Sequence, residues 1–227
     1  LRQVVTKTWE IGARGKSQDG KLQWSGALFT AQNVDDILFV SSSTNAGSGY
    51  FKNFGQTQRQ GLEMSLKGAH QQWTYGFNFT NLHATYQSPE TLVSSLNPLA
   101  NAQGQIHILP GNVIPLMPSR LLNARVAYAF TPTFKSGLSI NAVDSSFVRG
   151  NENNLPNAKI AGYAILNWSG SWRWRDHCMI YTQISNLTNQ KFSTSGALGS
   201  NAFSSAGTYN NSSTGTLYEA PGAPRAF

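Results

Sequence analysis

Residues 161–192 read AGYAILNWSGSWRWRDHCMIYTQISNLTNQKF, and this stretch decides the fold class. Before the charged turn at residues 175–177, every second side chain is apolar or glycine, and those between are mostly polar. Side chains alternate between the two faces of a strand, so this spacing predicts a β-strand with one apolar face. A second, antiparallel strand follows the turn. The apolar face of the first strand carries Ala164, Leu166, Trp168, Gly170, Trp172 and Trp174.

Three tryptophans on a face that is almost free of charge suit a lipid interface better than water. A soluble sheet could instead bury the same face against a second layer of structure. The quoted hairpin therefore leaves two environments open, and the rest of the chain has to separate them.

The composition describes β-structure with long polar loops. The chain has 227 residues, which is compatible with a single all-β barrel domain. Charged residues make up 12%, against about 25% in an average protein. The hydrophobic content is 40%, the aromatic content is 11%, and there are 21 glycines. A disordered chain would instead have high charge and few aromatic residues.

Charge and cysteine content exclude several classes of protein. The net charge of +7 favours anionic solutes or lipid head groups, or is an unspecific cationic surface. No two Lys or Arg residues are adjacent and no recognition helix is visible, so nucleic acid is not an expected partner. The single cysteine, Cys178, excludes an intrachain disulfide. No apolar run reaches the length of a transmembrane helix.

The first residues of the sequence are not expected to be a signal peptide. Leu1 is followed by neither a charged region nor an apolar core of the kind that signal peptides have. The sequence is therefore expected to be a mature chain or a piece of a longer protein.

The alternation seen in the quoted stretch recurs along the chain and predicts about eight long strands. The register is unclear at residues 29–36, where a bulge or a rise out of the membrane is expected. The further strands are expected at residues 7–16, 21–39, 50–67, 73–80, 120–130 and 138–149.

The connections between these strands alternate in length. Those near residues 18, 70, 132 and 176 are short, and those near residues 45, 100, 155 and 205 are longer. Outer-membrane barrels have short periplasmic turns and long outer loops. The sequence thus predicts an all-β, antiparallel meander of about eight long strands that is part of a transmembrane β-barrel.

Five short patches resemble the TonB-dependent outer-membrane receptors. Their order and spacing cover nearly the whole chain, although Thr188 replaces the usual Phe of its patch. The patches are TWEIGARG at residues 8–15, Asn-x-Gly-x-Thr-x-Arg-x-Gly-Leu-Glu at 53–63, IPLMP at 114–118, NLTNQKF at 186–192 and PGAPRAF at 221–227.

The resemblance implies a piece of a much wider barrel. The family has 22 strands and a plugged lumen, so residues 1–227 are expected to be strands fourteen to twenty-one, incomplete at both ends. The plug, the early strands and the energy-coupling box are expected to lie outside this segment, and residues 221–227 do not have the pattern expected of the closing strand. The domain prediction is the C-terminal part of an outer-membrane β-barrel.

The family also implies a function. It is active import of a scarce solute across the outer membrane of a Gram-negative bacterium, with a ferric siderophore first and cobalamin or a carbohydrate as further possibilities. Implied partners are outer-membrane lipid, a small-molecule ligand, and the TonB complex through the missing plug region. No cofactor is implied.

No residue pattern suggests an enzyme. The acidic side chains of Glu10, Asp35, Asp36 and Glu63 form no compact pair, as glycoside hydrolysis would require. The four histidines are scattered, so no metal site is expected. Phosphate-loop, zinc-protease and serine-hydrolase motifs are absent. Catalytic residues, metal ligands and a cofactor are therefore all predicted to be absent.

Three sets of side chains are expected to carry function in such a barrel. The predicted lumen wall consists of Arg14, Lys16, Glu63, Lys67, Asn123, Arg125, Asn141 and Arg173. The outer-loop ligand candidates are His107, Arg149, Glu152 and Tyr209. The predicted aromatic belt consists of Trp9, Trp24, Trp73, Trp168, Trp172 and Trp174.

Two other interpretations stay open at this point. Eight strands could close a passive, porin-like small barrel by themselves. The chain could also be a soluble carbohydrate-binding β-sandwich with exposed Trp and Tyr. In that case the apolar faces at residues 73–79 and 168–174 should press together in a dry interior.

Overall fold

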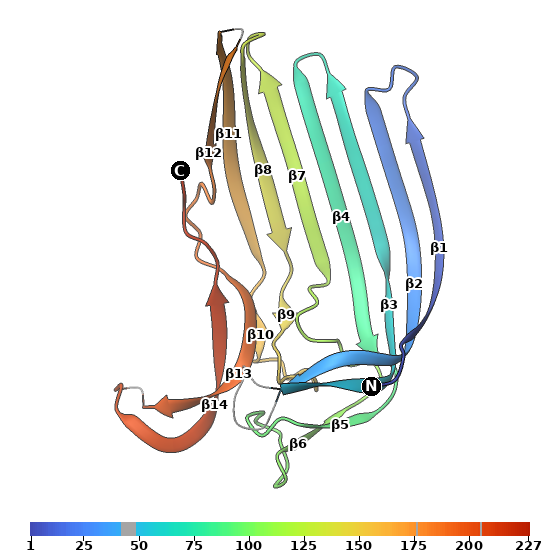
Figure 1. Cartoon of the computed structure of the whole chain (residues 1–227), viewed down its shortest axis with the longest axis vertical. Helices are drawn as coiled ribbons and strands as arrows, with labels where there is room; N and C mark the ends of the chain where they lie inside the picture. Colours follow the sequence, from blue (N-terminus) through green and yellow to red (C-terminus); the bar gives the residue numbers. More distant parts are fainter. Residues whose placement is uncertain (42–48, 176, 205) are drawn as a thin grey trace.

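The computed structural model describes residues 1–41, 49–175, 177–204 and 206–227. Its main feature is an eight-stranded antiparallel sheet, with the strands in the order β1-β2-β3-β4-β7-β8-β11-β12 (Figure 1). The long strands are β1 (Val5–Lys16), β2 (Leu22–Ser41), β3 (Gly49–His70), β4 (Trp73–Tyr86), β7 (Arg120–Ala129), β8 (Phe134–Val143), β11 (Tyr163–Arg175) and β12 (Cys178–Ile184).

The predicted meander is confirmed, and the sheet is open. Each long strand pairs with the next long strand along the chain, and within the described residues β1 and β12 are opposite edges that do not pair with each other. The eight strands thus form a curved wall and not a closed small barrel. In the described part of the chain, no helix has the length and apolar character needed to cross a membrane.

One face of this wall is apolar across seven adjacent strands. The row of paired residues that contains Trp24 has no polar side chain from β1 to β11, and neither does the row that contains Phe79. The first row is Gly15, Trp24, Leu66, Phe77, Ala124, Ile140 and Leu166. The second row is Ala13, Gly26, Met64, Phe79, Leu122, Ala142 and Ala164.

The opposite face is polar at the same depth. From β1 to β8, the row between the two apolar rows is Arg14, Ser25, Ser65, Asn78, Asn123 and Asn141, and on β11 it ends with the buried, apolar Ile165. Its members bond to each other: the Ser65 hydroxyl donates to Asn78 Oδ1 over 2.9 Å, and the Asn123 amide donates to Asn141 Oδ1. We call these two sides the apolar face and the polar face.

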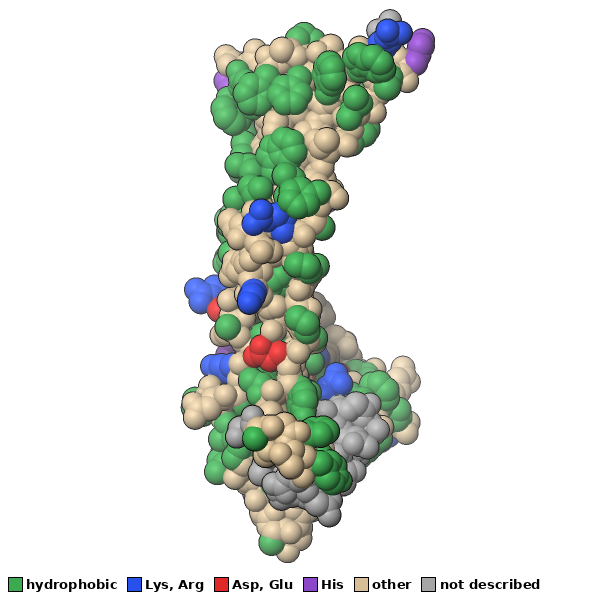
Figure 2. Space-filling model, turned by 90° about the vertical axis from the view of Figure 1, so that its left-hand side faces the viewer, with side chains coloured by type: hydrophobic (Ala, Val, Ile, Leu, Met, Phe, Trp, Pro, Cys, Tyr) green, Lys and Arg blue, Asp and Glu red, His purple; other side chains and the backbone are tan. Residues whose placement is uncertain are grey.

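The register overturns the β-sandwich interpretation. Tyr75 and Trp168 lie in one row of the apolar face, joined through Val126 and Leu138. The aromatic stretches of β4 and β11 therefore share one side of a single sheet and cannot pack against each other. That side is open, since Trp172 is 46% exposed and Ile11 is 74% exposed. Hydrophobic side chains gather there toward the end with the short turns (Figure 2), as on a barrel wall in lipid.

The short turns step along the sheet as they would in a tilted barrel wall. Lys16, Lys67 and Arg125 share one row, and the β1–β2 turn begins directly after Lys16. The β3–β4 turn begins three residues after Lys67, following His70, and the β7–β8 turn begins four residues after Arg125, following Ala129. The drift is about one residue per strand. A shift of about 3.3 Å per strand spacing of about 4.8 Å is a tilt of roughly 35°, close to the range of closed barrels.

The unclear register at residues 29–36 proves to be a bend and not a bulge. Val34 pairs with Gln56 and Asp36 with Phe54, so the register of β2 and β3 does not shift. Between them Asp35 takes a left-handed φ of 57°, and its carbonyl accepts from the Asn53 amide over 2.7 Å. Beyond this point the β2–β3 ribbon lies across the direction of the long strands (Figure 1). The expected loop near residue 45 lies outside the described residues.

The long connections at the other end contain more structure than the sequence predicts. Residues 87–119 hold β5 (Glu90–Val93) and β6 (Gln105–Ile108), and residues 193–219, expected as a loop, are largely β13 (Ser193–Phe203) and β14 (Tyr209–Pro221). The third connection holds β9 (Ser146–Phe147) and β10 (Lys159–Ile160). Residues 221–227 form no further strand, although Ala226 bridges to Ser185 beside β12.

The outer connections pack on each other around two small cores. The larger consists of Val40, Phe54, Ala84, Tyr86, Leu92, Ile106, Ile108 and Ile114. The smaller consists of Val148, Ala158, Ile160 and Leu198, with Leu96, Leu116 and Leu217 against it. Hydrogen bonds join the same connections, since the Ser94 hydroxyl and the Asn97 amide both donate to the Gly150 carbonyl over 2.9 and 2.8 Å. We call this set of connections the outer-loop assembly.

Candidate functional site

The polar face gathers all eight side chains of the predicted lumen wall. Arg14, Asn123 and Asn141 share one row, and Lys16, Lys67 and Arg125 share the row two residues nearer the short turns. Glu63 and Arg173 lie an even number of residues from these rows along β3 and β11, which places them on the same face. Side chains that are far apart in the sequence thus form one continuous polar surface.

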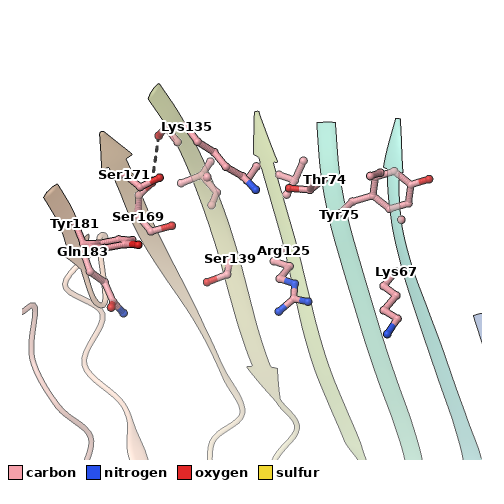
Figure 3. Close-up of a pocket in the computed structure, with 18 of the residues that line it drawn as sticks. Lys67, Thr74, Tyr75, Arg125, Lys135, Ser139, Ser169, Ser171, Tyr181 and Gln183 are labelled. Atoms are coloured by element: carbon pink, nitrogen blue, oxygen red, sulfur yellow. Dashed lines mark hydrogen bonds between the residues drawn. The ribbon is translucent and has the colours of Figure 1, made fainter. Parts of the chain in front are cut away.

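This surface is hollowed near the short turns. A hollow of about 850 Å³ extends from β2 to β12 and is lined by the cations Lys21, Lys67, Arg125 and Lys135 together with several hydroxyl groups (Figure 3). A hollow that spans so many neighbouring strands marks the polar face as the concave side. We call it the basic hollow, because no Asp or Glu lines it. The hydroxyl side chains of the polar face in its lining are Thr74, Ser139, Ser169, Ser171 and Tyr181.

A second hollow of about 550 Å³ lies on the same face and has mixed charge. Arg14 lines it together with Glu10 and Glu63, and polar side chains of β3 and β4 complete it. Glu63 is four residues from Lys67 along β3, on the side of the outer-loop assembly. The charge of the polar face therefore changes from mixed to purely positive toward the short turns.

The outer-loop candidates are only partly brought together. The Arg149 guanidinium lies over the Phe39 ring at 4.5 Å, and Glu152 sits in the same connection. His107 instead contacts the Thr91 hydroxyl at 3.1 Å on the β5–β6 pair. Tyr209 packs its ring against Phe203 at 6.1 Å. Arg149 and Glu152 thus lie in one connection, whereas His107 and Tyr209 have their own local partners.

Glu152 is a buried carboxyl group. It is 6% exposed, and its Oε1 accepts the Gly150 N–H over 3.0 Å. Burial raises its pKa, because a charged carboxylate loses its water there, and this effect exceeds the opposing influence of Arg149 and of the backbone N–H groups. The folded outer-loop assembly therefore prefers the neutral acid.

The raised pKa of Glu152 predicts a pH-dependent outer-loop assembly. The stabilisation is complete below the ordinary Glu pKa near 4.5 and is lost as the pH rises toward the raised pKa. We expect hydrogen exchange of residues 148–160 in the full receptor, corrected for intrinsic rate, to lose protection over this range. Glu152→Gln should abolish the slope, whereas Glu219→Gln, at an exposed position, should keep it. An unchanged slope in Glu152→Gln would contradict the assignment.

The sequence analysis does not identify two features of the candidate site: the cluster of polar side chains around Asp36 and the cation Lys135. Asp36, expected only as a rim charge, is 7% exposed and accepts from Thr57 at 2.6 Å and from Arg59 at 2.9 Å. Only the bend at Asp35 brings these groups together, and no local pattern indicates it. Lys135 could have been found, because it continues the polar alternation of β8 and lies three residues before the expected start at residue 138.

Five of the six predicted belt tryptophans lie on the apolar face, and the sixth, Trp174, is at the register shift of β11. Trp24, Trp73, Trp172 and Trp174 are next to short turns, whereas Trp9 and Trp168 lie farther along their strands. Aromatic neighbours that the sequence reasoning left out extend the group, since Tyr128 lies 4.7 Å from the Trp73 ring and 4.9 Å from that of Phe130. In the described part of the chain, no three His, Cys, Asp or Glu side chains are placed to hold a metal ion.

Comparisons with known proteins agree on one family. The family described as TonB dependent receptor-like, beta-barrel matches residues 1–187. A comparison with curated proteins found no match. The fold is similar to that of the siderophore receptor PiuA from Acinetobacter baumannii, with a TM-score of 0.69 and 16% identity over 97% of this chain and 27% of PiuA.

Two further solved structures give the same result. The ferric-catecholate import receptor Fiu from K12 E. coli in its closed form has a TM-score of 0.67 and 16% identity, over 99% of this chain and 27% of Fiu. The ferric yersiniabactin uptake receptor FyuA from Yersinia pestis has a TM-score of 0.67 and 17% identity, over 98% of this chain and 28% of FyuA. The chain thus spans little more than a quarter of these receptors.

The match is to transport receptors of the outer membrane and not to enzymes. The family match over most of the chain agrees with the tilted, open, two-faced wall. The chain therefore belongs to the TonB-dependent receptors and forms part of their outer-membrane β-barrel.

Proposed function

We propose that this chain is part of the wall of a receptor that imports a scarce solute across the outer membrane with energy delivered by TonB, and that the solute is a ferric siderophore. The observation that carries the proposal is the wall itself, which is apolar across seven strands on one side and polar and hollowed on the other. The polar face is the proposed lumen, and the apolar face contacts lipid.

The similar structures support the choice of solute. PiuA is described as a siderophore receptor, Fiu as a ferric-catecholate import receptor and FyuA as a ferric yersiniabactin uptake receptor. In this chain, the outer-loop assembly is the proposed capture site, and Arg149 and Glu152 are its proposed polar contacts. His107 and Tyr209 are proposed as separate contacts at the rim. TonB would act through a plug region of the receptor.

Uptake of labelled iron tests this function. Cells that lack the receptor gene should lose the accumulation of ⁵⁵Fe supplied as a ferric siderophore, and a plasmid copy should restore it. Cells that carry the receptor but lack TonB should fail to accumulate it as well, because passive diffusion cannot concentrate a solute. Receptor-dependent uptake that continues without TonB would instead show a passive channel and would refute the proposal.

A further inference from the structure

The lining of the basic hollow contains cations and no carboxylate. One of these cations, Lys21, pairs at 3.6 Å with Asp19, which lies outside the lining. Among the described residues, the cations of the polar face near the short turns that take part in no ion pair are Arg14, Lys16, Lys67, Arg125, Lys135 and Arg173. The carboxylates Glu10 and Glu63 border the second hollow and are absent from the lining of the basic hollow. A concave surface of one sign concentrates the field and attracts ions of the opposite sign.

A glycine leaves room for the side chain of one of these cations, Arg125. Gly76 lies between Lys67 and Arg125 in one row of the sheet, and a methyl group at Gly76 would lie 2.8 Å from Arg125 Nε. The Arg125 side chain therefore crosses over Gly76 toward the strand of Lys67. Like charges in one row of the sheet without a carboxylate between them repel each other, and a bound anion would reduce this cost.

We propose that the basic hollow is an oxyanion-binding subsite on the solute path, which takes carboxylate or phosphate groups of the transported molecule. This inference rests on the proposed import function, since it requires the solute to pass along the polar face. The guanidinium of Arg125 can bind two oxygens of one carboxylate or phosphate at once. Lys67 and Lys135 add point charges, and the hydroxyls of Ser139 and Ser169 are additional donors (Figure 3).

The position of the subsite gives it a role distinct from capture. It lies at the end of the wall with short turns, which in outer-membrane barrels faces the periplasm, whereas the outer-loop assembly lies at the opposite end (Figure 1). An anionic solute would meet it last. The subsite would favour passage of anionic solutes and oppose that of cationic ones.

Anion binding to the purified full receptor tests the subsite. The probes are citrate for carboxylates and inorganic phosphate for phosphates, with calorimetry at low ionic strength as the measurement. The double variant K67Q/R125Q should weaken binding of the preferred anion roughly tenfold, because two charges next to the anion are lost. The matched variant R14Q removes one cation from the same face, but from the hollow that contains Glu10 and Glu63. It should change the affinity less than about twofold.

The variant Gly76→Val tests whether anion binding depends on the position of Arg125 and not only on the net charge of the hollow. Valine fits a strand, and its nearest contact is the flexible end of Arg125, so the fold should be kept and only Arg125 displaced. Binding should weaken about as much as after loss of Arg125, although the net charge is unchanged. Equal anion binding by wild type, K67Q/R125Q and Gly76→Val would overturn the proposal.

Two further outcomes distinguish an anion subsite from a hollow that is filled by protein. A double variant with a lower thermal midpoint but unchanged anion affinity would show that a protein segment fills the hollow, and would also overturn the proposal. The uptake experiment is independent of these measurements. Loss of the subsite proposal would leave TonB-dependent iron uptake intact, whereas absence of such uptake with intact anion binding would refute the import function instead.

Discussion

Replacing Phe77 by lysine is expected to destabilise the folded receptor by about 2–4 kcal/mol, the cost of a charge at mid-membrane depth on a barrel wall. Phe77 lies in the row of the apolar face between Leu66 and Ala124. Its neighbours there offer no polar partner, so the ammonium group would face lipid. The free energy of unfolding in denaturant, measured for the full receptor in lipid vesicles, gives the effect directly.

Asn78→Lys is the matched control for this substitution. The position is the next residue of β4, at the same depth but on the polar face, where its amide oxygen accepts from Ser65. The loss of one exposed hydrogen bond should change the free energy of unfolding by about 1 kcal/mol or less. Equal destabilisation by the two lysines would show that the apolar face does not contact lipid.

Asn151→Ala is expected to open the connection between β9 and β10. The Asn151 side chain is completely buried, and its amide donates to the carbonyls of Leu155 and Ala158 over 2.9 and 2.8 Å. Its oxygen accepts the Leu155 N–H over 2.7 Å. Alanine would leave these backbone groups without partners in a dry site, at a cost of about 3 kcal/mol.

Hydrogen exchange measures this loss where it occurs. A local cost of about 3 kcal/mol corresponds to roughly 100-fold faster exchange of the amides at residues 148–160. Asn153→Ala, two residues away, removes only the contacts with Asn97 at 2.8 and 3.4 Å and should raise the exchange rates less than about tenfold. Similar rates in both variants would show that Asn151 does not organise the connection.

The long strands could be predicted because each carries its own signal. An apolar side chain at every second residue, as from Trp73 to Phe79, needs no knowledge of the neighbouring strands. The short turn at Asp19 and Gly20 likewise follows from local chemistry, since Gly20 has a φ of 69° and Asp19 accepts the N–H of Lys21. The two-residue alternation of apolar side chains and the residues of the short turns are together enough to predict the meander and its two faces.

The outer hairpin β13–β14 could not be predicted in the same way. Its sequence is rich in Ser, Gly and Asn, and few apolar side chains mark a face. The strands are held by distant residues, because Leu198 and Leu217 pack with Val148 and with Leu96 of another connection. Contacts of this kind are set by the tertiary structure, and a sequence window that contains only the hairpin does not show them.

The candidate site likewise has one part that the sequence predicts and another part that depends on the tertiary structure. That Lys67 and Arg125 share a face follows from alternation alone. The position of Arg125 over Gly76, in the row of Lys67, depends on the register of three strands and on a missing side chain in the middle one. The meeting of Asp36 with Arg59 depends on the bend at Asp35. The sequence thus predicts on which face of the sheet a side chain lies, but it does not predict which side chains of different strands come together.

The shared cores of the outer-loop assembly have a consequence for engineering and for evolution. Surface loops usually tolerate insertions one at a time because each packs mainly on itself. Here Gly150 accepts hydrogen bonds from Ser94 and Asn97, and Arg149 exchanges backbone bonds with Gly196 and Leu198. Lengthening any one connection would therefore disturb the other two, and a new specificity would require matched changes in all three.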